Sequence, residues 1–455
     1  MIFEKITSEG LAHNSYFLLS QGEVAIIDPR RDVDVYLDLA NKHGADILHV
    51  FETHRNEDYV SGGLELAHHT GATIHHGENL DFAFGKKVKE GDTIRTGALD
   101  FGILETPGHT PESISITLRH KGISDDYYMV FTGDALFAGD VGRIDFYRDS
   151  EAQKEAAKTL YDSLFNKILP LGDHVLVMPA HGAGSVCGGG ILGIPYSTIG
   201  FEKKNNAILQ KTREEFIEYK SQETFPIAPY MAKMEEYNKD GPPILQSLPF
   251  PKSLKMKGLK QHIVNGAQIV DVRKPSSFSG GHVPKSLNIW QSGLPLFAGW
   301  LLNYEDPIVI VKDAYQKLDP IIRFLVRLGY DKIVGYLSTF SKWFTSGERF
   351  ATANTWTVHR LQEKLSDTSL FILDVRDKES VEKEGKIPGA KNIFLGQLED
   401  QLTELPKDKH LCVYCDSGFK TSVAVSILMK ESFEEVTNIL GGFHAWENAG
   451  FEIEK

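Results

Sequence analysis

The chain has 455 residues, 41% of them hydrophobic and 24% charged, which indicates a soluble globular protein of roughly two to four domains. Its 49 basic and 62 acidic residues give a net charge of −13, which disfavours a nucleic-acid partner because phosphate binding needs a basic surface. No apolar run reaches membrane-spanning length and residues 1–5 lack a signal-peptide pattern, so we expect a cytoplasmic protein without a membrane partner.

Residues 1–210, the expected first domain, alternate short β-branched runs with polar clusters. The runs are residues 24–28, 47–50 and 128–132, and each ends where a polar cluster begins. This pattern places candidate ligand residues on loops at strand ends. Residues 33–43 and 150–164 have the spacing of amphipathic helices.

Four segments of this domain carry residue types that bind metals. They are His54 with Asp58, Thr106-Pro107-Gly108-His109, Thr132-Gly133-Asp134 and Pro179-Ala180-His181-Gly182. Their order and spacing resemble those of the metallo-β-lactamase superfamily, which implies a four-layer αββα sandwich. In that family the first segment reads His-x-His-x-Asp-His, and the equivalent of Asp134 bridges two metals.

Two histidines of the family's first motif are missing, because Asn56 and Tyr59 stand in their places. The resemblance leaves three metal ligands, His54, His109 and Asp134. It places three further residues behind them, Asp58, Tyr59 and His181. Two imidazoles and one carboxylate form the facial triad of non-haem Fe(II) enzymes, which leaves positions open for a substrate atom and dioxygen. A hydrolase needs only one metal-activated water, so the loss of ligands favours an oxygenase.

Residues 142–146, Gly-Arg-Ile-Asp-Phe, resemble the Gly-Arg-x-Asp-Phe segment of persulfide dioxygenases, a mononuclear iron branch related to glyoxalase II. The resemblance implies one Fe(II) per chain, with zinc as a substitute, and O2 as co-substrate. It also implies that a low-molecular-weight thiol persulfide is oxidised to sulfite. We expect Arg143 to bind the substrate, and Arg148, Lys203 and Lys204 are further basic candidates for an acidic thiol carrier.

The chain has three cysteines, an odd and sparse set that indicates reduced thiols rather than disulfides. Cys187 follows His181 by six residues in a glycine-rich segment. It is either a small packed thiol or a redox or sulfur-carrying thiol beside the metal cleft. Two histidine pairs, His68-His69 and His75-His76, flank a predicted turn, and we interpret them as surface residues.

Residues 211–248 are rich in charge and proline, which is typical of a linker that wraps a neighbouring surface. An internal repeat follows, in residues 249–350 and 351–455. Asp271-Val272-Arg273 recurs as Asp374-Val375-Arg376 at an offset of 103 (374 − 271). Each copy alternates apolar strand patterns with helical patterns, which predicts two α/β domains with parallel sheets.

The second copy contains a cysteine loop between an apolar strand and a helical pattern. Its sequence is Cys415-Asp416-Ser417-Gly418-Phe419-Lys420-Thr421. Backbone N–H groups of such a loop can stabilise a thiolate or bind an oxyanion. The loop resembles the active site of rhodanese sulfurtransferases, which implies that Cys415 carries sulfane sulfur and that the six residues after it bind the substrate. Lys420 stands at a position where such loops often have arginine. The positive charge is kept, but the planar guanidinium group that binds an anion through two hydrogen bonds is absent.

Cys412 and the middle copy are expected to have no part in sulfur transfer. Three residues of strand span about 10 Å, beyond the roughly 7 Å limit for a disulfide, so Cys412 cannot pair with Cys415 and is expected in the core. The offset of 103 (415 − 312) leads from Cys415 to Lys312, which is not a nucleophile. The middle domain is therefore predicted to be an inactive rhodanese-like domain that spaces or docks the other two.

The predicted fold is a metallo-β-lactamase αββα sandwich followed by two rhodanese-like α/β domains. The predicted function is a persulfide dioxygenase and sulfurtransferase in sulfide detoxification, with sulfite converted to thiosulfate through Cys415. We expect a homo-oligomer. The alternative is a glyoxalase II-like zinc thioester hydrolase fused to a rhodanese sulfurtransferase.

Overall fold

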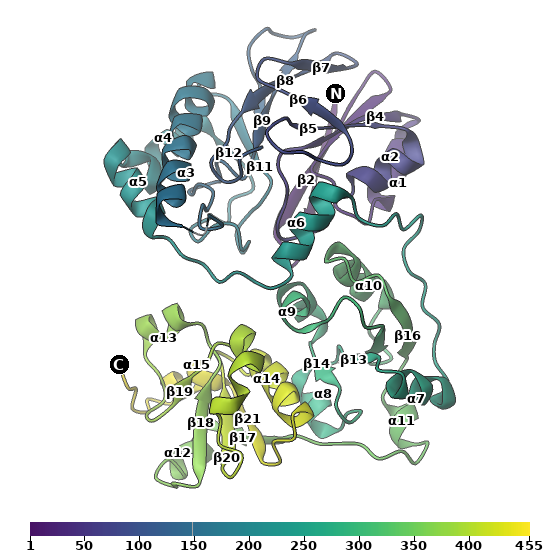
Figure 1. Ribbon diagram of the computed structural model, residues 1–455, viewed down its shortest axis with the longest axis vertical. Helices are drawn as coiled ribbons and strands as arrows, with labels where there is room; N and C mark the ends of the chain where they lie inside the picture. The colour runs from purple at the N-terminus through teal and green to yellow at the C-terminus, as the bar shows by residue number, and fades with distance from the viewer. Residues whose placement is uncertain (148) are drawn as a thin grey trace. The chain divides into compact units, whose positions relative to one another are not determined.

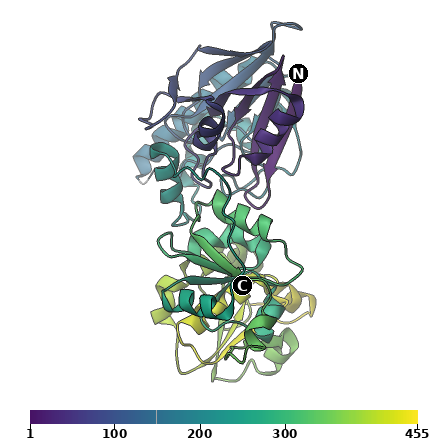
Figure 2. The same ribbon diagram turned by 90° about the vertical axis from the view of Figure 1, so that its right-hand side faces the viewer.

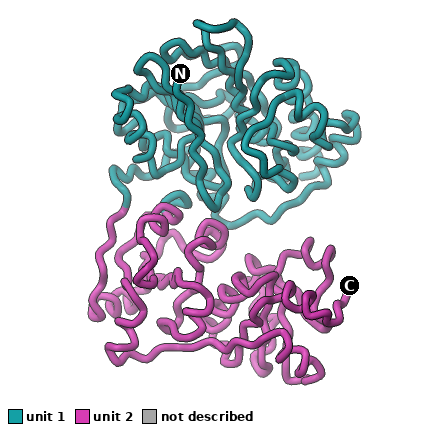
Figure 3. The backbone as a smooth tube through the Cα atoms, turned by 180° about the vertical axis from the view of Figure 1, so that it is seen from behind, with its two compact units in different colours: residues 1–248, 326–329 teal, residues 249–325, 330–455 magenta. Residues whose placement is uncertain are grey.

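The structure is a computed structural model that describes residues 1–147 and 149–455. Arg148, one of the basic candidates, lies outside the described residues. The chain divides into two compact units, residues 1–248 with 326–329, and residues 249–325 with 330–455 (Figure 3). No helix among the described residues combines the length and apolar character needed to cross a membrane.

The first unit is built on two six-stranded sheets. In spatial order, one sheet contains β1 (Ile2–Ser8), β2 (His13–Ser20), β3 (Glu23–Ile27), β4 (Asp46–Glu52), β5 (Thr73–Gly77) and β6 (Lys86–Val88). The other contains β12 (Ser197–Thr198), β11 (Leu176–Pro179), β10 (Met129–Gly133), β9 (Ile114–His120), β8 (Leu99–Glu105) and β7 (Thr93–Thr96). Helices α1 (Asp34–His43) and α2 (Gly63–Thr70) lie against the first sheet, and α3 (Ser150–Ser163), α4 (Ile199–Asn205) and α5 (Arg213–Gln222) lie against the second (Figures 1 and 2).

The strand sequences explain the four layers. Along β2, Tyr16 and Leu18 enter the core between the sheets, whereas Phe17 enters the core under α1. Along β3, Ala25 and Ile27 enter the core between the sheets, whereas Val24 and Ile26 enter the core under α1. Because successive strand residues point to opposite faces, sheets that are apolar on both faces need helices outside them. The predicted αββα sandwich is confirmed, as are the helices expected at residues 33–43 and 150–164.

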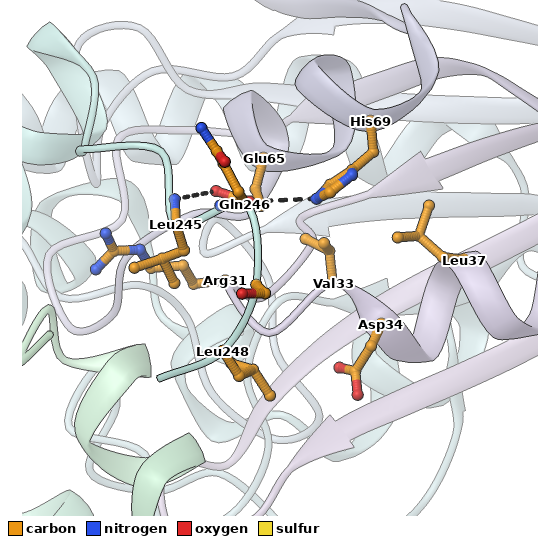
Figure 4. A pocket seen from close by; sticks show the side chains of 10 residues that line it. Arg31, Val33, Asp34, Leu37, Glu65, His69, Leu245, Gln246 and Leu248 are labelled. Carbon is orange, nitrogen blue, oxygen red and sulfur yellow. Dashed lines mark hydrogen bonds and ion pairs between the residues drawn. The ribbon is translucent and has the colours of Figure 1, made fainter. Parts of the chain in front are cut away.

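The segment predicted as a linker contains helices and lies against the first unit. Helix α5 buries Phe216 in the core beside α3, and α6 (Met231–Asp240) follows it. Farther along, the backbone N–H groups of Leu245 and Gln246 donate to the Glu65 carboxylate at 2.8 and 2.7 Å. These residues line a cavity of about 300 Å³ at α1 and α2 (Figure 4).

The interpretation of the histidine pairs is correct for one pair and wrong for the other. His68 and His69 are exposed at the end of α2. His75 and His76 are buried in β5, where His75 Nε2 lies 3.0 Å from His49 Nδ1 and His76 Nε2 lies 2.7 Å from the Phe84 carbonyl. Segment β5 is an interior strand of its sheet, so its side chains are covered on both faces.

The second unit contains two sheets whose strands are all parallel, as the repeat predicts. In the first copy the strands lie in the order β14 (Leu287–Asn288), β13 (Gln268–Asp271), β15 (Ile308–Val311), β16 (Ile333–Leu337). In the second copy they lie in the order β17 (Asn354–Thr357), β21 (Val436–Leu440), β20 (His410–Tyr414), β18 (Leu370–Asp374), β19 (Lys391–Asn392). The helices are α7 (Met256–Val264), α8 (Pro275–Gly280), α9 (Leu294–Leu301), α10 (Leu318–Arg327) and α11 (Ser341–Phe344), then α12 (Val358–Glu363), α13 (Lys378–Glu384), α14 (Phe419–Lys430) and α15 (Gly442–Asn448).

The recurring Asp-Val-Arg motif has the same structural role in both copies. Arg273 pairs with Asp271 and donates to the Gly281 carbonyl, and Arg376 pairs with Asp374 and donates to the Gly385 carbonyl. All four side chains are buried, so each charge is compensated by its neighbour. The motif therefore joins a strand end to the segment after the next helix.

Candidate metal centre and sulfur loop

The three predicted metal ligands meet in the first unit. His54 follows β4, His109 follows β8, and Asp134 follows β10, so each lies where a strand ends. The Nε2 atoms of His54 and His109 both lie 3.7 Å from Asp134 Oδ2. All three side chains are almost fully buried.

Hydrogen bonds on the far side of each ring orient the two histidines. His54 Nδ1 lies 2.9 Å from the Thr53 hydroxyl, and His109 Nδ1 lies 2.8 Å from the Arg143 carbonyl. Both Nε2 atoms are buried and have no hydrogen-bond partner among the described residues. Buried polar atoms are normally satisfied, and two such nitrogens beside a carboxylate fit a metal ion.

Glu57 joins this cluster, although the sequence reasoning missed it. Its Oε1 lies 3.3 Å from His109 Nε2 and its Oε2 lies 3.9 Å from His54 Nε2. His54, Glu57 and His109 offer ligand atoms that all lie within 4.8 Å of one another. The available signal was an extra carboxylate inside the motif, between Asn56 and Asp58.

His181 connects two carboxylates. Its Nδ1 lies 2.8 Å from Asp134 Oδ1 and its Nε2 lies 3.0 Å from Asp58 Oδ2. Burial opposes the charge on the ring, but Asp134 and Asp58 raise the pKa of His181 well above its usual value. His181 therefore orients Asp134. The sequence predicted that His181 and Asp58 would lie next to the metal ligands rather than among them.

The two residues that replace the family's histidines do not converge with the predicted ligands. Asn56 Nδ2 donates to the His54 carbonyl at 3.3 Å. The Tyr59 ring packs on His13, with ring centroids 3.8 Å apart, and its hydroxyl has no partner among the described residues. Burial raises the pKa of Tyr59 well above its usual value, so the phenol stays neutral and is a poor metal ligand. His13, on β2, was also missed by the sequence analysis.

The cluster carries strong opposing charges. Burial opposes ionisation of Glu57, but His109 and His54 lower its pKa to about 2. Burial likewise opposes protonation of His109, but Glu57 and Asp134 raise its pKa to about 9. Burial lowers the pKa of His54. The carboxylates Glu57, Asp58 and Asp134 give this cluster the negative charge that a bound cation would balance.

Cys187 lies beside this cluster of candidate metal ligands. Its thiol donates to Glu57 Oε1 at 3.5 Å, and its sulfur falls within 4.8 Å of ligand atoms of Asp58 and His181. The side chain is fully buried, and burial raises the pKa of Cys187 well above its usual value. The residue is thus packed in the interior and adjacent to the metal cluster at once.

Arg143 holds the loop of Cys187. Its guanidinium donates to both oxygens of Asp145 at 2.6 and 2.7 Å, to the Val186 carbonyl at 3.0 Å and to the Phe225 carbonyl at 3.4 Å. The side chain is 1% exposed. These contacts favour a positioning role over the predicted contact with substrate. The predicted basic candidate Lys203 forms an exposed ion pair with Asp173 at 2.7 Å.

Cys415 lies at the carboxyl end of β20, and its loop leads directly into α14. The Gly418 N–H donates to the Cys415 sulfur at 3.1 Å. Gly442 adopts a positive φ of 52°, and a Cβ there would lie 2.1 Å from the Cys415 carbonyl oxygen, so the glycine allows the loop to be held closely. Cys412 is a core residue, as predicted, and burial raises its pKa to about 12.

The residues after Cys415 divide by exposure. Asp416 and Lys420 form an ion pair at 2.9 Å, Ser417 and Phe419 are exposed, and Thr421 is buried with no partner for its hydroxyl among the described residues. The Lys420 ammonium thus already has a carboxylate partner. An anionic substrate would compete with Asp416 for this cation.

The equivalent loop of the middle domain has a lysine in place of the cysteine. Lys312, at the position of Cys415, donates to the carbonyls of Asp313 and Gln316 at 3.0 and 2.7 Å. The Gln316 side chain bonds the loop again, through the Asp313 N–H and the Val272 carbonyl. An ammonium group therefore occupies the place of the thiol in this loop.

The comparisons with known proteins agree with this architecture. The family model described as metallo-beta-lactamase superfamily matches residues 9–181, and the rhodanese-like domain model matches residues 255–346 and 357–449. The mitochondrial persulfide dioxygenase ETHE1 of Mus musculus is 32% identical over 205 residues, covering 43% of this chain and 70% of that protein. The chain belongs to the family of persulfide dioxygenase–rhodanese fusions. The predicted family and fold class are thereby confirmed.

Other relatives of this fusion are similar to one part of it or to most of it. The hydroxyacylglutathione hydrolase GloC of Haemophilus influenzae is 28% identical over 207 residues, covering 41% of this chain and 86% of that protein. A sulfurtransferase of Allochromatium vinosum is 31% identical over 94 residues, covering 20% of this chain and 87% of that protein. The crystal structure of a metallo-beta-lactamase from Staphylococcus aureus matches 74% of this chain and 98% of its own, at 29% identity and a TM-score of 0.65.

Proposed function

We propose that the fusion oxidises a low-molecular-weight thiol persulfide at one Fe(II) held by His54, His109 and Asp134. The balanced reaction converts the persulfide RSSH, O2 and H2O into the thiol RSH and sulfurous acid, which ionises to sulfite. The observation that carries this proposal is the convergence of two unpartnered Nε2 atoms on the Asp134 carboxylate. A bound Fe(II) would supply the redox chemistry with O2.

The surrounding residues prepare this site. Thr53 and the Arg143 carbonyl orient the two rings, and His181 orients Asp134. Burial of the whole cluster excludes bulk water, which favours oxidation of a bound sulfur over hydrolysis.

We further propose that Cys415 transfers sulfane sulfur. The Cys415 thiolate takes the outer sulfur of RSSH, forming a protein persulfide and releasing RSH. Sulfite then takes that sulfur, forming thiosulfate and restoring the thiolate. The Gly418 N–H and the amino end of α14 stabilise the negative sulfur in both states.

The second candidate function is thioester hydrolysis, which the similarity to the hydroxyacylglutathione hydrolase supports. Such a hydrolase would need zinc or a second metal ion. The packing of Tyr59 on His13 disfavours it, because a neutral buried phenol replaces a histidine that would hold that ion.

Oxygen uptake separates the two functions. We expect the Fe(II)-loaded full chain to consume O2 when glutathione persulfide is added and to release sulfite. The Asp134→Asn variant, loaded in the same way, is the control and should consume none. Cleavage of a glutathione thioester by the wild-type chain without O2 uptake from the persulfide would reverse the assignment.

Cys187 is proposed as a redox or sulfur-carrying thiol of the same site. Its sulfur lies one hydrogen bond from Glu57, so a persulfide formed there would face the metal ligands. The Cys187→Ser variant should change the turnover or the ratio of sulfite to other sulfur products. Unchanged turnover and unchanged products would leave Cys187 with a packing role alone.

A further inference from the structure

Glu57 is a buried carboxylate that the three-ligand centre does not require. Its side chain is 2% exposed, and its Oε2 has no hydrogen-bond partner among the described residues. The motif of the superfamily has no ligand at this position, since Glu57 lies between the second histidine position and Asp58. A buried ionised carboxylate is costly unless a cation or several donors compensate it.

The hydrogen bonds around the cluster determine which atoms can donate a proton into it. The Thr53 hydroxyl donates to Asp28, so it accepts from His54 Nδ1–H and leaves a lone pair on His54 Nε2. A carbonyl can only accept, so the Arg143 carbonyl leaves a lone pair on the Nε2 of neutral His109 in the same way.

The space between these atoms is therefore lined by electron-pair donors. His54 Nε2 and His109 Nε2 face one carboxylate oxygen of Asp134 at 3.7 Å and the two oxygens of Glu57 at 3.9 and 3.3 Å. His181 Nδ1 lies 2.8 Å from the other oxygen of Asp134 and 3.0 Å from this one. When both imidazoles are in the neutral form that binds a metal, none of these four groups has a proton to donate into the space, and a metal cation satisfies all four at once.

We propose that Glu57 is the fourth protein ligand of the metal and stands in for the ligand lost at Asn56. The inference rests on the proposed metal centre and extends it to two imidazoles and two carboxylates. The two carboxylates would balance the charge of a divalent ion. These four residues would hold the ion, and the bound ion would supply the redox chemistry between the persulfide sulfur and dioxygen.

The same residue connects Cys187 to the metal. The Cys187 thiol donates to Glu57 Oε1, the oxygen that lies nearer to His109. The thiol is thus one hydrogen bond away from a metal ligand. A change at Glu57 should alter both the metal and the environment of this sulfur.

The test is the metal affinity of the full-length chain, measured by competition with a chromophoric chelator, together with the visible absorption of the Co(II)-substituted protein. We expect Glu57→Gln and Glu57→Asp to weaken Co(II) binding on the order of 10- to 100-fold or more and to change the Co(II) bands. The Asp variant keeps the charge and withdraws the oxygens, so it separates ligation from charge. Circular dichroism of the metal-free variants checks that each is folded.

Two matched variants make the result decisive. Glu52→Gln changes a buried carboxyl that bonds Ser61 outside the cluster, and it should keep wild-type affinity. Asp134→Asn tests the centre itself and should lose affinity. Wild-type affinity and unchanged Co(II) bands in both Glu57 variants, with loss in Asp134→Asn, would overturn the role of Glu57 alone. Retained affinity in Asp134→Asn would instead overturn the metal centre on which the proposed function rests.

Discussion

The imidazole rings of the proposed metal ligands His54 and His109 are held by hydrogen bonds to protein atoms. Thr53 is central to this arrangement, since its hydroxyl bonds His54 Nδ1 and Asp28, and its N–H bonds Asp28 as well. The ring of His54 is therefore oriented before a metal binds. Such preorganisation raises affinity because little rearrangement accompanies binding.

We predict that Thr53→Val lowers metal affinity by about 10- to 100-fold. Valine keeps the shape of the side chain but cannot accept from His54 Nδ1–H, so the ring loses its orienting bond. Chelator competition on the full chain measures the effect. Thr70→Val, at an exposed helix end of the same unit, should leave the affinity unchanged. Equal affinities of the Thr53 variant and the wild type would show that the ring needs no such bond.

The two cysteines of β20 and its loop should respond differently to substitution. Cys415→Ser should abolish transfer of sulfane sulfur to sulfite and leave persulfide-dependent O2 uptake intact, because the predicted metal ligands lie in the other unit. Cys412→Ala should keep sulfur transfer but lower the melting temperature, since it removes a buried core side chain. Thiosulfate formation and thermal melting measure both. Sulfur transfer by the Cys415 variant would move the nucleophile elsewhere.

Residues in spaced motifs could be identified from the sequence, whereas residues defined by a neighbour far along the chain could not. His54, His109 and Asp134 follow predicted strands, and the structure brings them together. Glu57 gains its importance from His109 and from Cys187, which lies 130 residues away. The extra carboxylate is visible in the motif, but no local pattern encodes its contacts with His109 and Cys187, so Glu57 was missed.

At the scale of elements, strand β14 of the middle domain supports the helix that follows the sulfur loop. Asn288 accepts a hydrogen bond from the Ser422 hydroxyl, and its N–H donates to the Ser426 hydroxyl, both on α14. Trp290 packs against Phe419, the first residue of α14, with ring centroids 5.3 Å apart. The domain without a thiol therefore positions the loop of the domain that has one.

We predict that Asn288→Ala destabilises the protein by about 2 kcal/mol, because it leaves buried polar groups without partners. The Asn288 side chain also donates to the Asp271 and Arg273 carbonyls, so both sheets of the second unit are affected. Sulfur transfer should slow as α14 loosens. Denaturant unfolding and single-turnover sulfur transfer measure the two effects.

The control for this prediction is Asn265→Ala, at an exposed helix end of the same domain. It should change stability by no more than about 0.5 kcal/mol. Equal stability of the Asn288 and Asn265 variants would mean that β14 contributes no support to α14.

Elements with a clear hydrophobic period could be predicted, and α6 illustrates the opposite case. Its sequence is charged and follows a proline-containing stretch, so it was expected to be part of a linker. In the structure, Asn238 on α6 donates to the carbonyls of Asn56 and Tyr59 and accepts from the Ser61 N–H. The helix thus holds the backbone of the metal-motif loop through one buried amide, which a hydrophobic period cannot reveal.

At the scale of the whole molecule, the two copies of the tandem repeat share a fold and differ at the position of the thiol. The Asp-Arg pair and the parallel sheet remain in both copies, whereas Lys312 replaces the thiol in the first. The repeat could be predicted because these structural residues recur at a constant offset. The support of α14 by β14 could not, because Asn288 and Ser422 lie 134 residues apart.

Metal removal tests whether metal binding and sulfur transfer belong to separate units. All the proposed metal ligands lie within residues 1–248, so a bound ion stabilises the native state of that unit and leaves the other unchanged. At a free metal concentration of about 1,000 times the dissociation constant, the stabilisation is about 4 kcal/mol. This corresponds to a fall in melting temperature on the order of 10 °C when a chelator strips the metal.

Calorimetry of the full chain with and without the chelator measures this shift, and sulfur transfer through Cys415 should survive the treatment at moderate temperature. The Asp134→Asn variant should melt at the lower temperature under both conditions, because it cannot hold the ion. A chelator that leaves the melting profile unchanged would contradict a metal site in the first unit. A chelator that also stops sulfur transfer would contradict the assignment of that activity to Cys415 alone.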